Sequence, residues 1–285
     1  MATFVPPVTL YDLLLEAIQF GSDEEAYQAV SEALSRPPAQ ASKALRTLSH
    51  ILPDVIRLRK NHLLQYLLQN GVTVIAAAVK MAAGLLYESA KYYLELLFAH
   101  GWDINRALSN TEPPVLSIAL HDTLLTRWLL ATGADPNAHC DMDYTPLSLA
   151  VQTAPLSIVE LLLQYGRHCH NGHLIYYATQ RADINETMQM TELLYQYTKP
   201  VDDILWQDAT SYCLRAQFLR GTPLYYACIE NKVPVALKLL DLGADPDKAC
   251  MRYNESVGPT PREVAIQNGG VIAERLAGAG GQFVH

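Results

Sequence analysis

Histidine and cysteine side chains gather at two places in this sequence. His168, Cys169, His170 and His173 lie within six residues of one another, and His139-Cys140-Asp141 precedes them. Imidazole nitrogens and thiolate sulfurs are ligands that Zn²⁺ prefers, so a zinc site is one interpretation. The spacing, however, matches no closed Cys/His pattern, and neutral histidines are common in turns. We therefore predict no metal site.

The acidic pair Asp202-Asp203 is the other group with catalytic chemistry. Two carboxylates can act as general acid and general base when a fold brings them to a substrate. No spacing argument brings a partner to this pair, so we interpret it as a solvated or helix N-terminal feature. The sequence has no Gly-x-Ser-x-Gly, phosphate loop or dinucleotide fingerprint. We expect no cofactor and no catalytic residue, which favours a protein that is not an enzyme.

The elements that position these side chains are clearest in residues 133–166. Thr145 and Pro146 predict a helix start, because threonine is a good N-cap and proline fits the first helical position. A leucine-rich helix follows and ends at Gly166, as the preceding helix ends at Gly133. Both glycines are expected in the left-handed conformation that closes a helix. Two short helices with tight turns must stack on neighbours to bury their apolar faces.

This unit recurs along the chain. A glycine follows a leucine-rich helix at positions 71, 101, 133 and 166, at intervals of 30, 32 and 33 residues, and again at 243. Gly133-Ala-Asp-Pro-Asn recurs as Gly243-Ala-Asp-Pro-Asp, and Thr145-Pro-Leu recurs as Thr222-Pro-Leu. A period of this length with these two signatures closely resembles the ankyrin repeat.

The resemblance implies an all-α fold, an ankyrin-repeat solenoid of stacked helix-turn-helix units with projecting turns. It is strong over 90–166 and 221–269, and degenerate over 41–72 and 172–204. We expect a single domain over 1–285, opened by a helical N-terminal cap at 9–40 whose outer face is more polar. The expected repeats are 41–72, 73–105, 106–138, 139–171, 172–204, 221–249 and 250–281, with an insertion at 205–220.

Three local features depart from the best repeat. Pro53 is expected to divide the helical pattern of the first repeat. The first helix of the second repeat, Val74–Leu86, is longer than an ankyrin first helix should be. In the repeat 106–138, Pro113-Pro114 is expected to start the first helix.

In ankyrin-like arrays the turns project from one edge, and the first helices line a concave groove beside them. The resemblance implies that partners dock on this combined surface. The contact positions carried over are Asp141, Met142, Tyr144, Gln152 and Thr153 in the best repeat, and Gln180, Arg181, Ile229, Glu230, Gln267 and Asn268 in later repeats.

The family's Thr-Pro-Leu-His motif uses its histidine to link neighbouring repeats, and no repeat of this chain keeps it. Ser148 takes that position in the best repeat, and Tyr176 and Tyr225 take it in two adjacent later repeats. The tyrosines have two interpretations. They are either core filler for a slightly wider spacing, or phenols that face the groove, where aromatic anchors dominate recognition.

The insertion adds Trp206, Tyr212 and Phe218 to the edge formed by the turns. Loops on one edge of a repeat array are often its binding face. Alternatively, the insertion covers the poorly formed repeat 172–204 and buries its apolar surface. The two interpretations are compatible.

The composition restricts the partner and the compartment. The net charge of −8 argues against nucleic acid, which needs a basic surface. Five cysteines without paired spacing suit a reducing compartment. No signal peptide or membrane-spanning run is predicted. We expect a monomeric protein of the cytoplasm, with the nucleus as a second compartment.

The favoured function is a scaffold or adaptor that recognises another protein or peptide through the groove and turns of residues 139–260. The alternative is an enzyme or small-molecule binder, using a pocket closed by the insertion over Tyr176 and Tyr225. A third interpretation is self-association through the apolar N-terminal helices.

Overall fold

The computed structural model describes residues 8–166, 172–197, 201–207 and 209–279. Within these ranges the chain is helical, and the only sheet is one two-stranded hairpin. The helices are α1 (Leu10–Phe20), α2 (Asp23–Leu34), α3 (Pro38–Arg57), α4 (Asn61–Gln69), α5 (Ala76–Ala83), α6 (Tyr87–Ala99), α7 (Thr123–Ala131), α8 (Pro146–Thr153), α9 (Leu156–Tyr165), α10 (Leu174–Thr179), α11 (Ile184–Tyr195), α12 (Ala209–Arg215), α13 (Pro223–Ile229), α14 (Val233–Asp241), α15 (Pro261–Asn268) and α16 (Gly270–Ala279); the 3₁₀ turns are η1 (Val115–Ser117) and η2 (Ala119–His121), and the strands are β1 (Met251–Arg252) and β2 (Glu255–Ser256).

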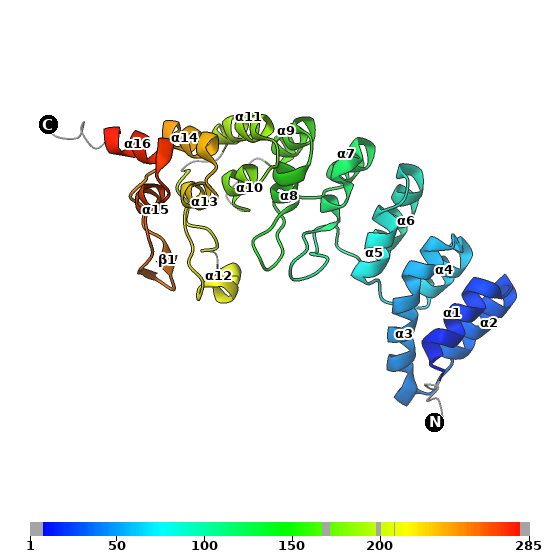
Figure 1. The fold of residues 1–285 in the computed structure, drawn as a ribbon. Coiled ribbons are helices and arrows are strands. Elements are labelled where there is room, and N and C mark those ends of the chain that lie inside the picture. Colours follow the sequence, from blue (N-terminus) through cyan, green and yellow to red (C-terminus); the bar gives the residue numbers. More distant parts are fainter. Residues whose placement is uncertain (1–7, 167–171, 198–200, 208, 280–285) are drawn as a thin grey trace, which may run out of the picture.

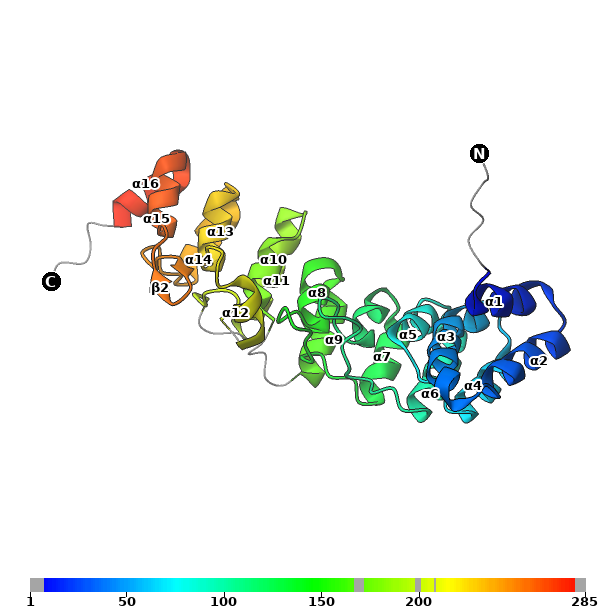
Figure 2. The same cartoon turned by 90° about the horizontal axis from the view of Figure 1, so that it is seen from below.

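The helices stack in two layers along an arc, with the two ends of the chain at opposite ends of it (Figures 1 and 2). The inner layer contains α5, η1, α8, α10, α13 and α15, each packed against the next. The outer layer contains α6, α7, α9, α11, α14 and α16, each packed on its inner partner. One continuous cluster of buried apolar side chains runs from Leu14 in α1 to Leu276 in α16. The predicted all-α solenoid of helix-turn-helix units is confirmed.

Side-chain caps fix where the inner helices begin. Thr145 accepts the N–H of Ser148, and the Ser148 hydroxyl accepts the N–H of Thr145, while Pro146 occupies the first turn of α8. Thr222 caps α13 and Thr260 caps α15 in the same way, each followed by proline. Because these bonds satisfy orphan N–H groups locally, the Thr-Pro signal predicted the helix starts correctly.

The glycine predictions are confirmed at Gly133 but wrong at Gly166. Gly133 has a φ of +105°, and the matching glycines 71, 101 and 243 are also left-handed. Gly166 has a φ of −91°. A Cβ there would lie 2.8 Å from Nδ2 of Asn137, so Gly166 lies close to the preceding turn, and its backbone angles do not favour glycine.

Two helix predictions near the N-terminus are wrong. α3 continues through Pro53, although an internal proline costs about 3 kcal/mol. Leu52 and Val55, on either side of it, are completely buried, so core packing holds the helix together. The expected long helix Val74–Leu86 is the shorter α5, because the chain leaves the helix at Gly84 before α6 begins.

The helix expected after Pro113-Pro114 is replaced by the two 3₁₀ turns η1 and η2. The sequence between this segment and α7 is short, so the tighter turns fit where an α-helix does not. The carbonyl of Ala119 accepts both the N–H of Asp122 at 2.8 Å and the hydroxyl of Thr126 at 2.7 Å, which ties the second 3₁₀ turn to α7.

The insertion and the turn after α14 form one projecting unit. Arg220 and Met251 exchange two backbone hydrogen bonds of 2.9 and 2.8 Å, and the Tyr253 N–H donates to the carbonyl of Ala216 at 2.7 Å. Figure 1 shows α12 and the hairpin together on the edge where the turns project. We call residues 205–207, 209–220 and 250–257 the composite finger. In the described ranges, no helix is long and apolar enough to cross a membrane.

Candidate functional site

Aromatic side chains from three neighbouring units meet along the inner layer. The ring centroids of Tyr144 and Tyr177 are 4.9 Å apart, those of Tyr177 and Tyr176 are 5.2 Å apart, and those of Tyr176 and Tyr226 are 5.1 Å apart. Trp206 of the composite finger lies 5.8 Å from Tyr176 and 6.2 Å from Tyr226. Most pairs are edge-to-face, which aromatic quadrupoles favour. We call these five residues the aromatic ladder.

The ladder residues are half-buried, and their phenols stay neutral at physiological pH. Burial raises the pKa of Tyr144 to about 12. Burial also raises the pKa of Tyr176, Tyr177 and Tyr226 above the usual value of a phenol. The ladder is therefore an uncharged surface with an apolar body and hydroxyl groups, which suits a partner with apolar and hydrogen-bonding groups.

Tyr225 is core filler, and the prediction that it faces the groove is wrong. It is 5% exposed, and burial beside the Cys250 thiol raises its pKa to about 12. A Cβ at Gly221 would lie 2.3 Å from the Tyr225 ring, so the backbone that leaves the composite finger passes directly over it. The ring fills the space where a pocket over Tyr176 and Tyr225 was expected. Its neighbour Tyr226 takes the groove position instead.

Trp206 is latched to the preceding units through His173. The backbone N–H of Trp206 donates to Nε2 of His173 at 2.9 Å. The carboxylate of Asp143 lies 3.2 Å from the same nitrogen and forms an ion pair with it only when the imidazole is protonated. The same carboxylate accepts the N–H of Gly172 at 3.2 Å. The latch joins the turn before α8, the turn before α10 and the composite finger, so it sets the position of the indole in the ladder.

His173 is one of the residues on which the zinc interpretation rests, and its Nε2 accepts the hydrogen bond from Trp206. His168, Cys169 and His170 lie outside the described residues. His139 bonds through Nδ1 to the carbonyl of Cys140 at 3.0 Å. Among the residues that the structure describes, no group of three His, Cys, Asp or Glu side chains could hold a metal ion.

Arg220 organises the interior of the composite finger. It is 1% exposed; Nη1 donates to the Trp206 carbonyl at 2.9 Å and Nη2 donates to the Tyr253 carbonyl at 2.5 Å. Its guanidinium lies 4.9 Å from the ring centroid of Tyr212. Tyr212 therefore packs on this arginine, whereas Phe218 remains exposed. The insertion therefore buries the Arg220 side chain and also exposes the apolar side chain of Phe218.

The far side of the groove carries polar and apolar positions together. Gln180 donates from Nε2 to Glu230 at 3.4 Å, which links α10 to the end of α13. Glu230 also pairs with Lys232 at 2.6 Å, so its charge is compensated. Ile229, next to it, is 49% exposed. Three of the positions expected to contact a partner, Gln180, Ile229 and Glu230, are thus brought together.

Arg181 acts inside the array, so its assignment as a contact residue is wrong, whereas Asn268 is exposed and also bonds to the preceding inner helix. The Arg181 side chain is 7% exposed, and Nη1 donates to the carbonyls of Val151 and Ala154 at 2.8 and 3.1 Å. Asn268 donates to the carbonyl of Cys228 at 2.9 Å. Each side chain satisfies backbone acceptors at the end of the preceding inner helix. Gln267 is exposed beside Asn268.

The predicted contacts of the best repeat are only partly brought together. The Tyr144 hydroxyl donates to Oε1 of Gln152 at 3.0 Å, which joins the turn to the groove. Asp141 and Met142 are half-buried in the turn, and Thr153 is exposed at the end of α8, where its hydroxyl bonds within the helix.

The acidic pair has a structural role. Asp202 accepts the N–H of Asp245 at 2.8 Å, and its carbonyl accepts from Lys248 at 2.6 Å. Burial raises the pKa of Asp202. Asn105 makes the same contact with the N–H of Asp135 at 2.7 Å three units earlier. Asp202 therefore connects its own turn to the next one.

The sequence interpretation missed Tyr177, Tyr226 and the latching His173. The doublets Tyr176-Tyr177 and Tyr225-Tyr226 occupy the same place in adjacent units, and that repetition was the available signal.

No family model matches the chain. The chain is 29% identical over 159 residues to the ankyrin repeat protein nuc-2 of Neurospora crassa. That match covers 51% of this chain and 14% of the relative, so the chain corresponds to a small part of that protein. Among solved structures, the human ASB11 ankyrin repeat domain is similar with a TM-score of 0.46 and 23% identity, covering 71% of this chain and 83% of that one.

Proposed function

We propose that this ankyrin-repeat protein is a scaffold or adaptor, which binds another protein or a peptide along the aromatic ladder and the exposed edge of the composite finger. The observation that carries the proposal is the ladder itself. Five half-buried aromatic rings from α10, α13, the turn before α8 and the finger form one connected surface. Tyrosine and tryptophan are the residues that most often dominate binding energy at protein interfaces.

The position of the ladder supports recognition rather than internal packing alone. Fully buried aromatic residues would only fill the core, as Tyr225 does. Ladder rings keep part of their surface exposed, and Ile229 on α13 and Phe218 in the composite finger are exposed apolar residues of the same units. A connected surface with rigid side chains loses little conformational entropy when a partner binds, which favours affinity.

The charge of the site supports a protein partner over a nucleic acid. The chain carries a net charge of −8, and Glu230 at the groove edge is compensated by Lys232. Phosphate recognition needs clustered cations, which this groove does not present among the described residues. We also propose that the protein acts as a monomer in a reducing compartment, the cytoplasm or the nucleus. Four cysteines in the described ranges are free, which agrees with that compartment.

The test is quantitative capture of partners by the tagged full chain from cell extract, with mass-spectrometric readout. Trp206→Ala and Ile229→Asp should each reduce recovery of the same partner by about 30-fold if they remove a hot spot of about 2 kcal/mol. Leu124→Asp is the matched control, because Leu124 is also exposed but lies on α7 in the outer layer. Equal partner recovery by both groove variants and the control would refute the site.

A further inference from the structure

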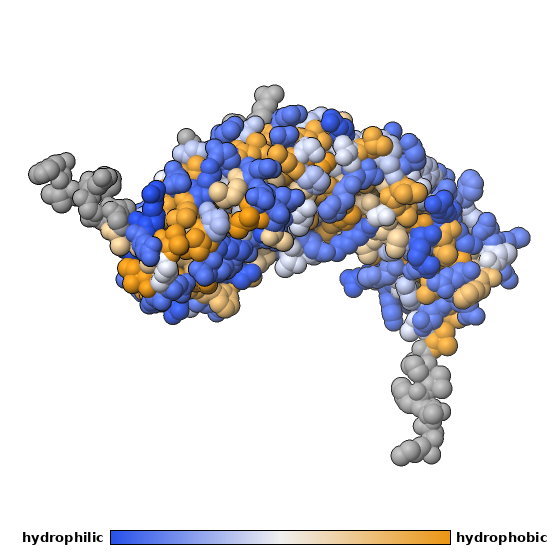
Figure 3. All heavy atoms as spheres, turned by 45° about the horizontal axis from the view of Figure 1, so that its top comes forward, coloured by the Kyte–Doolittle hydropathy of each residue, from blue (hydrophilic) through white to orange (hydrophobic). Residues whose placement is uncertain are grey.

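The N-terminal end of the array presents a second apolar surface. Val8, Leu13 and Phe20 are 69%, 53% and 83% exposed. Leu13 and Phe20 are seven residues apart on α1, so they lie on the same helix face. Figure 3 shows apolar residues at this end of the molecule, on the right, next to hydrophilic ones. Part of the surface of the N-terminal cap is therefore apolar, whereas exposed Glu24, Glu25 and Glu32 of α2 agree with the expected polar face.

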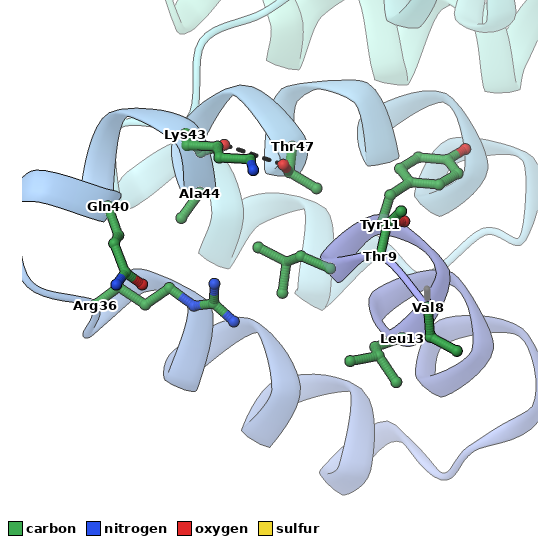
Figure 4. A pocket seen from close by; sticks show the side chains of 10 residues that line it. Val8, Thr9, Tyr11, Leu13, Arg36, Gln40, Lys43, Ala44 and Thr47 are labelled. Atoms are coloured by element: carbon green, nitrogen blue, oxygen red, sulfur yellow. Dashed lines mark hydrogen bonds between the residues drawn. The ribbon is translucent and has the colours of Figure 1, made fainter. Parts of the chain in front are cut away.

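A hollow of about 610 Å³ opens beside this surface, between α1, the end of α2 and α3. Val8, Leu10 and Leu13 contribute apolar lining, and Arg36 and Lys43 contribute cations. In Figure 4, Val8 and Leu13 lie on one side of the hollow, while Arg36, in the connection between α2 and α3, and Lys43, on α3, lie across it. The hollow thus has an apolar wall and a cationic wall.

The cationic wall has a charge opposite in sign to the net charge of the whole chain. Residues 35–60 contain six Lys and Arg and one Asp, a net charge of +5, in a chain of net charge −8. Arg36, Lys43 and Arg46 make no ion pair with any residue that the structure describes. Unpaired cations next to exposed apolar side chains match a partner that offers carboxylates next to apolar side chains.

We propose that this hollow is a docking site for an acidic amphipathic helix of a partner protein. The apolar face of that helix packs on Val8 and Leu13, and its carboxylates pair with Arg36 and Lys43. This is the helix-in-groove mode of recognition. The concavity favours a protein over an anionic membrane, because inserted side chains fill a hollow that a flat lipid surface leaves empty. The site lies at the opposite end of the array from the aromatic ladder and does not depend on it (Figure 1).

The probe is a fluorescent synthetic helix of about 16 residues, with Leu at helical spacing on one face and Glu on the other. Its anisotropy is measured against the full chain. Arg36→Glu/Lys43→Glu should raise Kd by about tenfold or more, because two attractions become repulsions. Leu13→Ser should raise Kd about fivefold through lost apolar contact. Arg127→Glu, an exposed arginine on the outer helix α7, should leave Kd unchanged.

Three further arms decide the identity of the occupant. The same peptide with Lys in place of Glu should not bind, and vesicles containing phosphatidylserine should not bind more tightly to the wild-type chain than to the double variant. The chain alone should stay monomeric in sedimentation. The proposal is overturned if the Lys peptide binds as well as the Glu peptide, or if neither variant changes Kd. It is also overturned if vesicle binding or self-association, rather than peptide binding, depends on Arg36 and Lys43.

Discussion

Replacing Arg220 with methionine tests whether one buried guanidinium holds the composite finger together. Methionine keeps most of the aliphatic volume and removes the charge. The guanidinium makes two hydrogen bonds, to the carbonyls of Trp206 and Tyr253, and stacks on Tyr212. Hydrogen bonds that involve a charged group contribute about 1.5–3 kcal/mol each, and the cation–π contact about 0.5–1 kcal/mol.

The cost of burying the guanidinium opposes these gains. No carboxylate pairs with Arg220 among the described residues, so several kcal/mol of desolvation is only partly offset. Methionine removes that penalty but leaves two carbonyl oxygens unpaired, at about 1–3 kcal/mol each. The cost of the unpaired carbonyls and of the lost stacking is larger than the gain from removing the buried charge. We therefore expect Arg220→Met to lower the free energy of unfolding by about 2–4 kcal/mol.

The assay combines urea unfolding with hydrogen exchange. Because repeat units interact mainly with their neighbours, lost protection should concentrate in α12 and the β1–β2 hairpin and leave α5 and α6 unchanged. Arg215→Met is the matched control. Its guanidinium lies 5.1 Å from the Trp206 ring centroid, so the control should cost only about 0.5–1 kcal/mol. If both variants lose the same stability, or exchange rises equally along the whole array, the role given to Arg220 is refuted.

Three other predictions concern the core beneath the finger. Gly221→Ala should destabilise the protein by about 1–3 kcal/mol, since its Cβ would lie 2.3 Å from the Tyr225 ring and 2.8 Å from Sγ of Cys250; an unchanged melting temperature would contradict that close approach. Iodoacetamide at pH 8 with peptide mapping should label exposed Cys213 about a hundredfold faster than Cys228, because burial raises the pKa of Cys228 to about 11; equal rates would contradict its burial. Cys228 should contribute about 2 kcal/mol to the fall in unfolding free energy between pH 9 and 11, beside the contributions of buried Tyr144 and Tyr225, because the unfolded chain loses the Cys228 proton first; a Cys228→Ala variant with the same pH slope as the wild type would exclude this contribution.

Local signals predicted the architecture, whereas nonlocal contacts decided the site. Thr145 bonds within its own turn, so sequence alone predicted the start of α8. Tyr225 and Tyr226 are adjacent on α13, and both fit an inner helix by pattern. Which ring enters the core depends on the backbone at Gly221, directly after the first part of the composite finger, and on the thiol of Cys250, which belongs to its second part. No periodicity in α13 carries that information.

The position that holds histidine in the Thr-Pro-Leu-His motif is occupied here by other residues, and in three consecutive units it contacts the turn that follows. The Ser148 hydroxyl donates to the carbonyl of Gly172 at 2.7 Å, in the turn before the next inner helix. Tyr176 packs on Trp206, which follows it by 30 residues, and Tyr225 contacts the thiol of Cys250, which follows it by 25.

Each of these positions therefore touches the next turn or finger, by hydrogen bonding, ring stacking or burial. The larger tyrosines stand where the following turn carries an insertion, and serine stands where it does not. We infer that the insertions and the tyrosines depend on each other, because a longer finger needs a larger side chain beneath it to fill the space. The presence of Tyr176 in the aromatic ladder follows from this packing.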